Sequence, residues 1–561
     1  MITTSDAILD ALERGGVRCL FGIPDPAFLD LLVGAQVRGM TIVTPHHEAA
    51  AGFMAEAAAR LTGQPTAVLL SPGPGVANAL PAMACARAER APVLFLGGAR
   101  GNLREPALTG RFQHGDQMAL VAGAVKHAAR MAAPQQAAAM VAQALARAQG
   151  GVPGPVYLDC PFDVMMGRGD QDLPTLPPVT FDAGAVTQAA ALIAQATTPM
   201  LLVGHGLTTA ERDAVAGLAR AMACPILLTP GAAALPGLSS RCLPYGFSPV
   251  AAEVIAQADL VLAVGTALGE AVHFGRRRYW NKGLVDRRWI RIDGEGLAVN
   301  RPIDVALIGD AGAMAQALVA AVVAAVTPRA DDTARWPAQE VARLAAWGGA
   351  ARAHPAAPLH PARLVAEVMA AIPPEALLVR DGGAGVLFQL AQSAPHEGGV
   401  LWSRTFAHLG TGLPYAIGAL AAERATGAAP RPAVLLSGDS AMLFHIAELE
   451  VAARLALPLV CVVAVDHQWG LEAAAYRQRF GEEGARPGVA WGGATRFDII
   501  AQGFGAKGRY VGDADDMPAV LSEALAHQGP TVIHVAIDPR ANGGDLPGWG
   551  ELASWYSDGM G

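Results

Sequence analysis

Short apolar runs alternate along the whole chain with segments whose apolar residues recur at helical spacing. The runs 41–43, 433–436 and 459–465 each predict a short buried strand. The segment 49–61 has apolar residues on one helical face, and Gly63 suits the position after its last turn. A helix is also expected over 443–455. This alternation predicts an α/β architecture with parallel sheets.

Two stretches interrupt the alternation, and both read as linkers. The first covers residues 165–178, and the second runs from 327 to about 361 with a short helical pattern inside it. Both are polar and rich in proline or glycine, as expected of connections between domains. They leave three blocks of domain size, 1–164, 183–326 and 360–540. The first and third blocks share a strand, glycine turn and helix character.

Composition narrows the possible classes of protein. A chain of 561 residues is too long for one ordinary core. Its charged content of 16% is below the roughly 25% of a typical soluble domain. This leaves surface free for contacts between subunits and favours an oligomer. The net charge of -8 and the absence of a basic run argue against a nucleic-acid partner.

Targeting and redox signals are also absent from the sequence. The first twelve residues lack the basic and apolar regions of a secretory signal, and no run reaches the roughly 18 apolar residues of a membrane span. Membrane attachment is therefore not expected. None of the six cysteines forms a CxxC pair, so we interpret them as small buried hydrophobes. The cytoplasm is the expected compartment.

The third block contains two acidic residues placed where a cation could bind. Asp439 and Asp466 each follow a predicted strand, and ligands of open α/β sheets bind at the carboxyl ends of strands. Two carboxylates there can hold a hard divalent cation, which would bridge to a diphosphate near the free N–H groups of the turn. Alternatively, Asp439 is only a helix N-terminal acid and Asp466 a turn residue. The local pattern leaves both interpretations open.

The spacing of these residues resembles a known signature. Gly438-Asp439, with Asp466 27 positions later and Gly470 beyond it, resembles the Gly-Asp-Gly…Asn-Asn motif of thiamine-diphosphate-dependent enzymes. Ser440 replaces the second glycine and Asp466 the second asparagine. The resemblance implies that Mg²⁺ is held by Asp439, Asp466 and the backbone carbonyl of Gln468.

Two upstream segments extend the resemblance. The turn 381–384 resembles the family's diphosphate-contact turn, and 406–414 resembles the segment under the pyrimidine ring of the cofactor. Leu409 would then bend the cofactor, and the Ala407 carbonyl would accept a hydrogen bond from its 4′-amino group. The sequence alone favours Leu409 as an ordinary core residue. The cofactor-binding residues implied are Gly382, Gly383, Ala384, Ala407, Leu409, Gly438, Asp439, Ser440, Ala441, Asp466, Gln468, Trp469 and Gly470.

Glu48 opens the predicted helix of the first block. Alone, it could simply complement the helix dipole. Two other segments of the first block, Phe21-Gly22-Ile23-Pro24 before Glu48 and residues 71–75 after it, occur in the order of the family's pyrimidine-binding domain. The resemblance implies that Glu48 bonds N1′ of the cofactor and so promotes loss of the C2 proton. It also implies that the first and third blocks of different subunits meet at the active site, in a homodimer or homotetramer.

The resemblance covers about residues 5–540 and implies three domains. A pyrimidine-binding domain (1–164) and a diphosphate- and metal-binding domain (360–540), both α/β folds, would flank a Rossmann-like central domain (183–326). Acetolactate synthases often hold FAD in the central domain. Their characteristic segment is replaced here by residues 265–270, so FAD is not expected.

The chain looks like the acetolactate synthase, benzaldehyde lyase and 2-oxoacid decarboxylase group. Gln113 stands where carboligases carry an active-site glutamine, and His114 and Glu472 are further candidates for catalysis. We expect a lyase or carboligase acting on 2-oxoacids or 2-hydroxyketones, with simple decarboxylation as the alternative. A degenerate homologue that binds a cofactor or nucleotide without chemistry also stays open, although retention of Glu48 argues against it.

Overall fold

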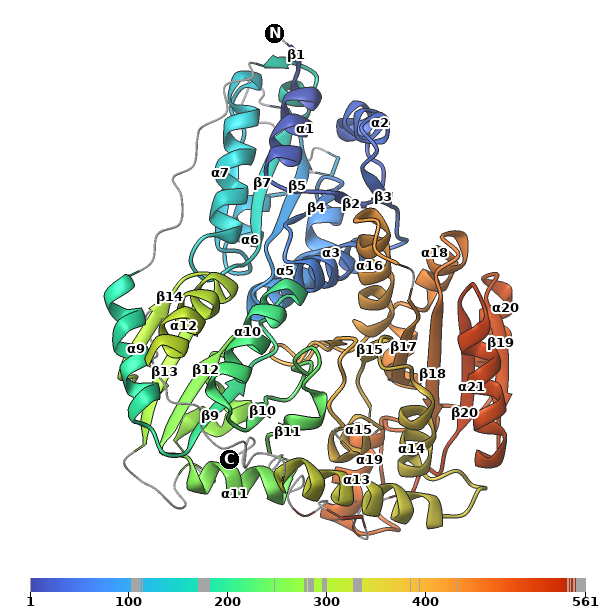
Figure 1. The fold of residues 1–561 in the computed structure, drawn as a ribbon. Helices are drawn as coiled ribbons and strands as arrows, with labels where there is room; N and C mark the ends of the chain where they lie inside the picture. The colour runs from blue at the N-terminus through green and yellow to red at the C-terminus, as the bar shows by residue number, and fades with distance from the viewer. Residues whose placement is uncertain are drawn as a thin grey trace.

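The computed structural model describes residues 2–101, 112–113, 115–169, 182–246, 248–276, 280, 287–294, 300–325, 335–383, 385–392, 394–429, 431–541, 544, 546–547 and 550. Its described part contains three six-stranded sheets, and every strand pair within them is parallel. The α/β architecture predicted from the hydrophobic pattern is therefore confirmed (Figure 1).

The first sheet has the strand order β3-β2-β4-β5-β7-β6. Its strands are β2 (Cys19–Gly22), β3 (Thr41–Val43), β4 (Thr66–Leu70), β5 (Val93–Ala99), β6 (His127–Arg130) and β7 (Val156–Pro161). The helices around it are α1 (Thr4–Arg14), α2 (Leu29–Val37), α3 (Glu48–Thr62), α4 (Pro74–Asn78), α5 (Leu80–Ala88), α6 (Gln117–Val121), α7 (Ala137–Gln149) and α8 (Phe162–Met165). A two-stranded antiparallel pair, β1 (Ile2–Thr3) and β8 (Arg168–Gly169), closes this first unit.

The central sheet has the order β11-β10-β9-β12-β13-β14, which is the strand order of a Rossmann fold. Its strands are β9 (Pro199–Val203), β10 (Ile226–Leu228), β11 (Cys242–Pro244), β12 (Leu260–Val264), β13 (Arg288–Asp293) and β14 (Val305–Ile308). With them lie α9 (Ala183–Gln195), α10 (Thr209–Met222), α11 (Pro249–Gln257) and α12 (Ala311–Ala325). Together these elements form the central unit.

The third sheet has the order β16-β15-β17-β18-β20-β19. Its strands are β15 (Leu377–Arg380), β16 (Val400–Leu401), β17 (Ala433–Gly438), β18 (Leu459–Val465), β19 (Lys507–Val511) and β20 (Thr531–Ala536). The helices of this third unit are α13 (Arg335–Ala353), α14 (Pro361–Ala371), α15 (Gly385–Gln392), α16 (Gly412–Ala425), α17 (Asp439–Leu443), α18 (Leu449–Arg454), α19 (Gly470–Phe480), α20 (Phe497–Gly503) and α21 (Met517–Ala526). The single helix expected over 443–455 is wrong: the chain turns at Phe444 and His445 and passes through a 3₁₀ turn, Ile446–Glu448, before α18 begins.

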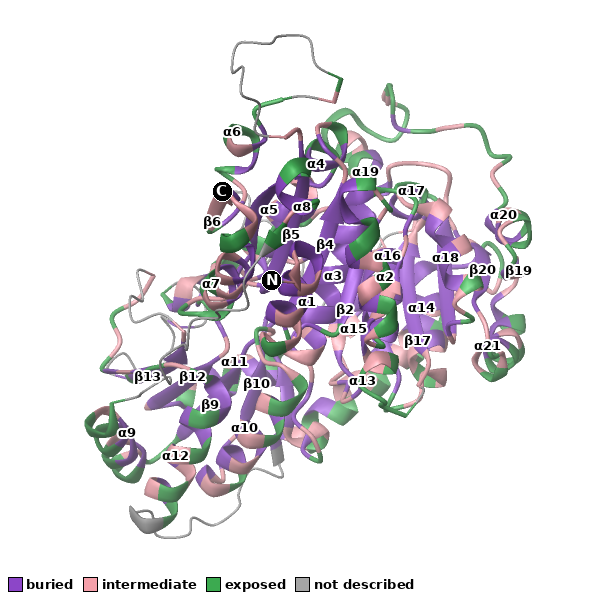
Figure 2. Cartoon of the chain, turned by 90° about the horizontal axis from the view of Figure 1, so that it is seen from above, coloured by how far each residue is buried: buried purple, intermediate pink, exposed green. Residues whose placement is uncertain are grey.

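The first and third units share one hydrophobic core. Helices α3 and α16 lie side by side, and Phe53, Met54, Tyr415 and Ile417 belong to the same buried cluster. The two backbones approach so closely that a Cβ on Gly418 would lie 2.1 Å from the carbonyl oxygen of Met54. In Figure 2 central strands of the three sheets, such as β4, β12 and β18, are buried, whereas outer helices such as α9 and α21 carry exposed residues.

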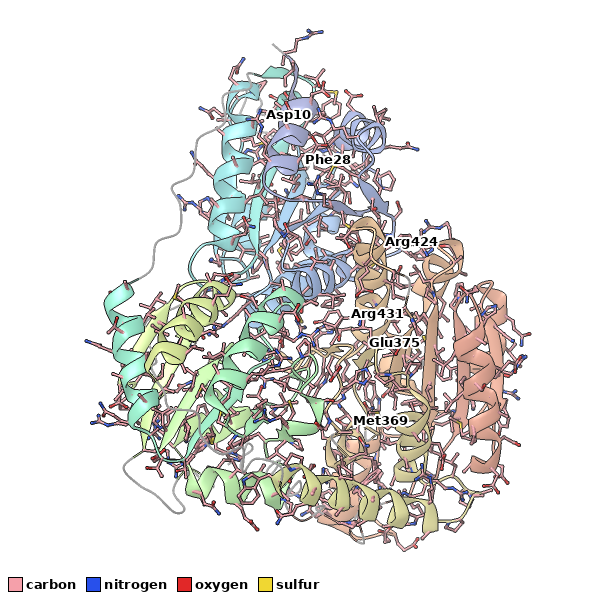
Figure 3. All side chains as sticks on the ribbon, in the orientation of Figure 1. Asp10, Phe28, Met369, Glu375, Arg424 and Arg431 are labelled. Carbon is pink, nitrogen blue, oxygen red and sulfur yellow. The ribbon has the colours of Figure 1, made fainter. Side chains whose placement is uncertain are left out.

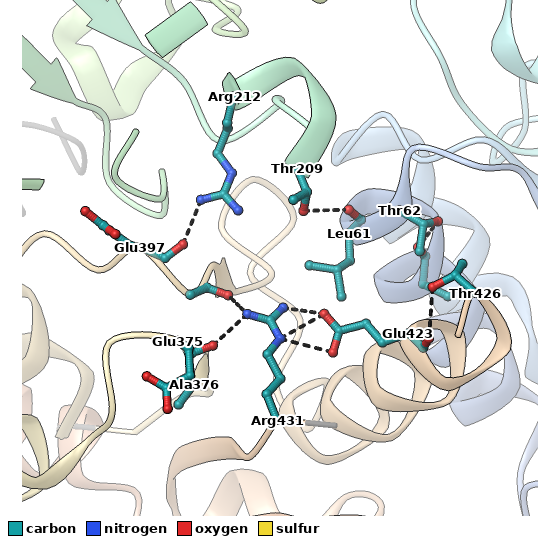
Figure 4. A network of polar contacts seen from close by, with 12 residues as sticks. Leu61, Thr62, Thr209, Arg212, Glu375, Ala376, Glu397, Glu423, Thr426 and Arg431 are labelled. Carbon is teal, nitrogen blue, oxygen red and sulfur yellow. Dashed lines mark hydrogen bonds and ion pairs between the residues drawn. The ribbon is translucent and has the colours of Figure 1, made fainter. Parts of the chain in front are cut away.

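Polar contacts join the three units as well (Figure 4). The Thr209 hydroxyl, at the start of α10, donates to the Leu61 carbonyl of α3 over 3.2 Å. Arg212, also on α10, donates to the Glu397 carbonyl over 2.9 Å. Within the third unit, Arg431 binds the Glu423 carboxylate and donates to the Glu375 carbonyl over 2.8 Å. Figure 3 labels Arg431 and Glu375 on the whole chain. The central unit is thus hydrogen-bonded to both neighbours.

Two sequence-based expectations concern burial and membranes. All six cysteines are buried, as their interpretation as small hydrophobes predicted. Among the helices of the described residues, none combines the length and apolar character needed to span a membrane.

Candidate functional site

The structure brings Asp439 and Asp466 together at one edge of the third sheet. Strands β17 and β18 are parallel neighbours, and each acid directly follows one of them. One carboxylate oxygen of Asp439 accepts from the Ser440 N–H over 2.7 Å, and the other accepts from the His467 N–H over 2.8 Å. The backbone that carries Asp466 is therefore tied directly to Asp439.

The electrostatics of this pair fit a cation. Burial, followed by the negative charge of Asp466, raises the pKa of Asp439 to about 7. Burial also raises the pKa of Asp466. Asp439 is buried and Asp466 half-buried. Two such neighbouring carboxylates are stabilised when a divalent cation compensates both charges, and their oxygens are the ligands that Mg²⁺ prefers. The residues present therefore fit a hard divalent cation.

Gln468 orients the second acid of the pair. Its side-chain amide donates to the Asp466 carboxylate over 3.1 Å and to the Pro539 carbonyl over 2.9 Å. The Gln468 amide thus links the Asp466 carboxylate to Pro539, which lies in the segment after β20. That the Gln468 backbone carbonyl is a metal ligand stays a prediction.

Three glycines bring two turns into direct contact beside these acids. The Gly438 N–H donates to the Gly382 carbonyl over 2.9 Å, which links the turn after β15 to the turn after β17. A Cβ on Gly382 would lie 1.9 Å from the Leu409 side chain, and one on Gly438 would lie 2.9 Å from the Gly382 oxygen. Gly383 has a φ of 110°, a backbone conformation that residues with a side chain rarely adopt. The structure therefore brings four of the predicted residues into contact: Gly382, Gly383, Leu409 and Gly438. Ala384 lies outside the described residues.

Asp381 is a structural residue of the site whose role the sequence did not reveal. Its carboxylate accepts from the N–H groups of Gly382, Gly410 and Gly412 at 2.7, 3.0 and 2.8 Å. Burial raises the pKa of Asp381, and these three bonds oppose that rise. The acid thus ties the glycine turn to the segment that carries Leu409. Its place at the end of β15, before two glycines, was the available signal.

The segment 406–409 presents the other residues expected around a pyrimidine ring. Ala407 is exposed and has a φ of 56°, an uncommon conformation for a residue with a side chain. His408 follows, and its Nδ1 lies 2.6 Å from the Leu409 carbonyl oxygen. The His408 ring also packs against Phe53 of α3 at a centroid distance of 5.1 Å.

Glu48 occupies the first position of α3, as expected. The His47 side chain caps this helix by accepting from the Ala49 N–H. The Glu48 carboxylate is buried and accepts from the Asn78 amide over 3.1 Å and from the Ser71 hydroxyl over 3.4 Å. The acid therefore faces the turn 71–75 after β4. Its two side-chain donors were not identified from the sequence, because they become its neighbours only through the fold.

Gln113 borders the same turn. A Cβ on Gly73 would lie 3.0 Å from the Gln113 carbonyl oxygen, and Arg100 lies 3.5 Å from the Gln113 side-chain oxygen. The structure thus brings Gln113 close to the turn that Glu48 faces. His114 lies outside the described residues.

The remaining candidates belong to the start of α19. The Trp469 N–H donates to the Val489 carbonyl over 2.9 Å, and Gly470 begins the helix. Glu472 lies in the first turn of this helix and is exposed in the single chain. The hydrogen-bond donors to Glu48 belong to the first unit, and those to Asp439 belong to the third. Their meeting across a subunit interface stays a prediction.

A cavity of about 1730 Å³ lies where the three units meet. Its lining includes Arg60 and Glu89 of the first unit, His205 and Asp293 of the central unit, and Arg404 and Ala407 of the third. Because Ala407 lines this cavity, the segment 402–409 contacts both the cavity and the Gly382 turn.

Comparisons with known proteins identify the family of this chain. Models of the thiamine pyrophosphate enzymes match the N-terminal cofactor-binding domain over residues 2–120, the central domain over 186–318 and the C-terminal cofactor-binding domain over 383–535. The chain is 30% identical to a probable 2-ketoarginine decarboxylase of Pseudomonas aeruginosa, over 95% of this chain and 94% of that protein. It is 29% identical to an acetolactate synthase large subunit of Parasynechococcus marenigrum, over 96% of this chain and 88% of that protein.

A solved structure shares the fold. The thiamine diphosphate-dependent 4-hydroxybenzoylformate decarboxylase of Rhodococcus jostii superposes with a TM-score of 0.76, over 96% of this chain and 99% of its own, at 22% identity. Together with the matches of all three domain models, the sequence relatives show that this chain belongs to the family of thiamine pyrophosphate enzymes, whose cofactor is also called thiamine diphosphate.

Proposed function

We propose that this enzyme requires Mg²⁺ and breaks or forms a carbon–carbon bond beside the carbonyl of a 2-oxoacid or 2-hydroxyketone. The observation that carries the proposal is the convergence of Asp439 and Asp466 with the Gly382 and Gly438 turns. Acidic oxygens for a cation and side-chain-free backbone for a diphosphate then lie next to each other.

The residues of the third unit would bind the charged end of the cofactor. Asp439, Asp466 and the Gln468 carbonyl would hold the cation. The glycine turns, with Ser440 and Ala441, would lie against the diphosphate, and Trp469 and Gly470 would border it. Leu409 would support the bent cofactor, and Ala407 would accept from its amino group.

Glu48 would supply the acid that activates the cofactor. When bound, thiamine diphosphate supplies a nucleophilic carbon and takes up the electron pair released as the bond beside the carbonyl breaks. Glu48 would hold a proton at N1′ of the pyrimidine, while Ser71 and Asn78 keep its carboxylate oriented. Since this requires the first unit of one subunit to meet the third unit of another, we propose a homodimer or homotetramer.

Gln113 would orient the substrate, because its amide can hydrogen-bond a carbonyl or hydroxyl group. Cleavage followed by addition to a second carbonyl makes the enzyme a lyase or carboligase. The alternative is a non-oxidative decarboxylase, in which a proton donor such as Glu472 or His114 acts in place of the second carbonyl compound. The names of the relatives include both kinds of enzyme, so product analysis decides between them.

The first experiment is a calorimetric or circular-dichroism titration of metal-stripped protein with thiamine diphosphate, with and without Mg²⁺. Saturable binding that depends on Mg²⁺ supports the proposed site. A panel of 2-oxoacids, each offered with and without an aldehyde acceptor, then shows whether the product is a new 2-hydroxyketone or only an aldehyde. No binding at millimolar cofactor would contradict the proposal and favour a degenerate homologue.

A further inference from the structure

A buried polar network lies between the first and third units and reaches the central unit. Arg60 of α3 lies between two buried acids, 3.2 Å from the Glu56 carboxylate and 3.9 Å from the Glu89 carboxylate. The Tyr415 hydroxyl of α16 donates to Glu56 over 2.5 Å. The His205 Nε2 of the central unit lies 3.2 Å from Glu89. One network of ionisable groups thus contacts all three units.

The network holds the backbone of residues 402–405. The Thr405 N–H donates to the Glu89 carboxylate over 2.5 Å, and Arg60 donates to the Trp402 carbonyl over 3.2 Å. The Arg404 side chain donates to the Pro230 carbonyl of the central unit over 3.0 Å. Because these partners belong to other units, the position of the segment depends on how the units meet.

The held segment leads directly into the proposed cofactor contact. Ala407 has a left-handed φ of 56°, and such a residue needs surroundings that fix it. Just after it, the His408 N–H donates to the Ser403 hydroxyl over 3.3 Å, so the loop is also closed on itself. A segment fixed before and after Ala407 aims the Ala407 carbonyl in one direction.

The charge of Glu89 suits this role. Burial alone would raise the pKa of Glu89, but the bond with His205, the charge of Arg60 and the Thr405 N–H together hold the pKa below its ordinary value. By contrast, burial raises the pKa of Glu56 to about 7 and the charge of Glu89 adds to that rise. Glu89 is therefore the permanent anion of the network, and charge-assisted hydrogen bonds of this kind are the strong ones.

We propose that Glu89 is a positioning residue that, with Arg60, fixes the segment 402–408 and so aims the Ala407 carbonyl at the 4′-amino group of the cofactor. This inference rests on the proposed function. Glu89 itself need not touch the cofactor, since it acts through the Thr405 backbone.

The test compares Glu89→Ala, Glu89→Gln and a matched control, Glu340→Ala. Glu340 is equally buried. It is ion-paired with Arg343 at 2.5 Å and accepts a hydrogen bond from the Ser248 hydroxyl over 2.6 Å, but it lies on α13 and has no contact with the segment 402–408 among these bonds. Glu89→Gln keeps an oxygen that can accept from the Thr405 N–H. It tests the proposed role of Glu89 if Glu89→Ala does not fold. Hydrogen exchange is measured on each full-length chain without cofactor, and binding is measured with thiamine diphosphate and with its 4′-deamino analogue, both with Mg²⁺.

The expected result is faster exchange at 402–408 in Glu89→Ala than in Glu340→Ala or wild type. Affinity for thiamine diphosphate should fall about two- to tenfold, as expected when one neutral hydrogen bond to the 4′-amino group is lost, with Glu89→Gln intermediate. For the deamino analogue, wild type and both Glu89 variants should bind alike.

Unchanged exchange, or an equal loss of affinity for both ligands, would overturn the inference. If the wild-type chain itself binds no thiamine diphosphate, the proposed function fails. The exchange comparison would still decide whether Glu89 fixes the segment.

Discussion

The first and third units are built on the same plan but offer different residues at the same places. Counted along the chain, the strands of both sheets follow the order second, first, third, fourth, sixth, fifth. Helices α3 and α16 each follow the second strand of their unit, and they pack against each other (Figure 1). The two units therefore meet through equivalent helices.

The difference lies at the carboxyl ends of the strands. After the third and fourth strands, the third unit carries Asp439 and Asp466, whereas the first unit carries Ser71 and Arg100. The acid of the first unit, Glu48, instead opens the helix after the second strand. The shared topology thus provides the same positions twice. The proposed division of work, metal and diphosphate in one unit and activating acid in the other, depends on which side chain fills each position.

The sharpest test of this division is Glu48→Gln. The amide keeps the size of the side chain but cannot hold the proton that the proposal requires. We expect turnover to fall about 100- to 10,000-fold, the range for a lost general acid or base, while affinity for the cofactor changes little. Steady-state kinetics and a cofactor titration check both expectations. Glu13→Gln, on α1 and bound to Arg38, serves as control, and full turnover in Glu48→Gln would remove Glu48 from its proposed role.

The complementary change in the third unit is Asp439→Asn. It removes one of the two carboxylate charges at the proposed cation site, and charge count sets the affinity of oxygen-ligand sites. We expect Mg²⁺-dependent binding of thiamine diphosphate to weaken by about 100-fold. Calorimetric titration measures the loss. The cation-free variant should unfold at a temperature similar to that of the wild type, because one of two mutually unfavourable charges is gone. Retained Mg²⁺ dependence would place the cation elsewhere.

The parts of the site that the sequence predicted are those set by local pattern. Alternating strands and helices placed Asp439 and Asp466 at neighbouring strand ends and Glu48 at the start of a helix, and the structure confirms these positions. The parts it missed depend on contacts between distant segments. Asp381 binds Gly410 and Gly412, and Glu89 binds Thr405 from another unit, so no periodicity marks either acid.

The wrong helix over 443–455 has the same kind of cause. Its apolar spacing suits a continuous helix, but the chain turns at His445 and brings Glu448 to the start of α3. There the Glu448 carboxylate accepts from the His46 N–H at 3.1 Å. A contact across 402 positions of sequence therefore accompanies the break in the helix.

The packing of the two equivalent helices is tested by Gly418→Ala. The added Cβ would lie 2.1 Å from the Met54 carbonyl oxygen, so α3 and α16 must move apart. Overpacking of this kind costs about 1–3 kcal/mol, and we expect the free energy of unfolding to fall by that amount. Gly217→Ala on α10 is the control, because its Cβ would meet only Val319 at 4.0 Å. Chemical denaturation measures both, and equal stability of the two variants would show that the helices do not pack this closely.

The contact between the two units at the start of α3 is tested through Glu448. Burial raises the pKa of Glu448 to about 7, against the opposing effect of the His46 N–H. An unfolded glutamate has a pKa of about 4.3, so the folded state binds more protons between about pH 4 and pH 7. The ionised form is therefore the costly one in the folded chain, and the free energy of unfolding should fall as the pH rises through this window.

Glu448→Gln isolates that contribution. The glutamine cannot ionise, so the free energy of unfolding of the wild type should fall relative to that of the variant by about 3 kcal/mol between about pH 4.5 and pH 8. Chemical denaturation at pH 4.5 and pH 8 measures this difference and cancels the other titrating groups, including Glu56. Parallel pH dependences of wild type and variant would mean that Glu448 ionises normally. Its carboxylate would then not be enclosed between the third unit and the start of α3.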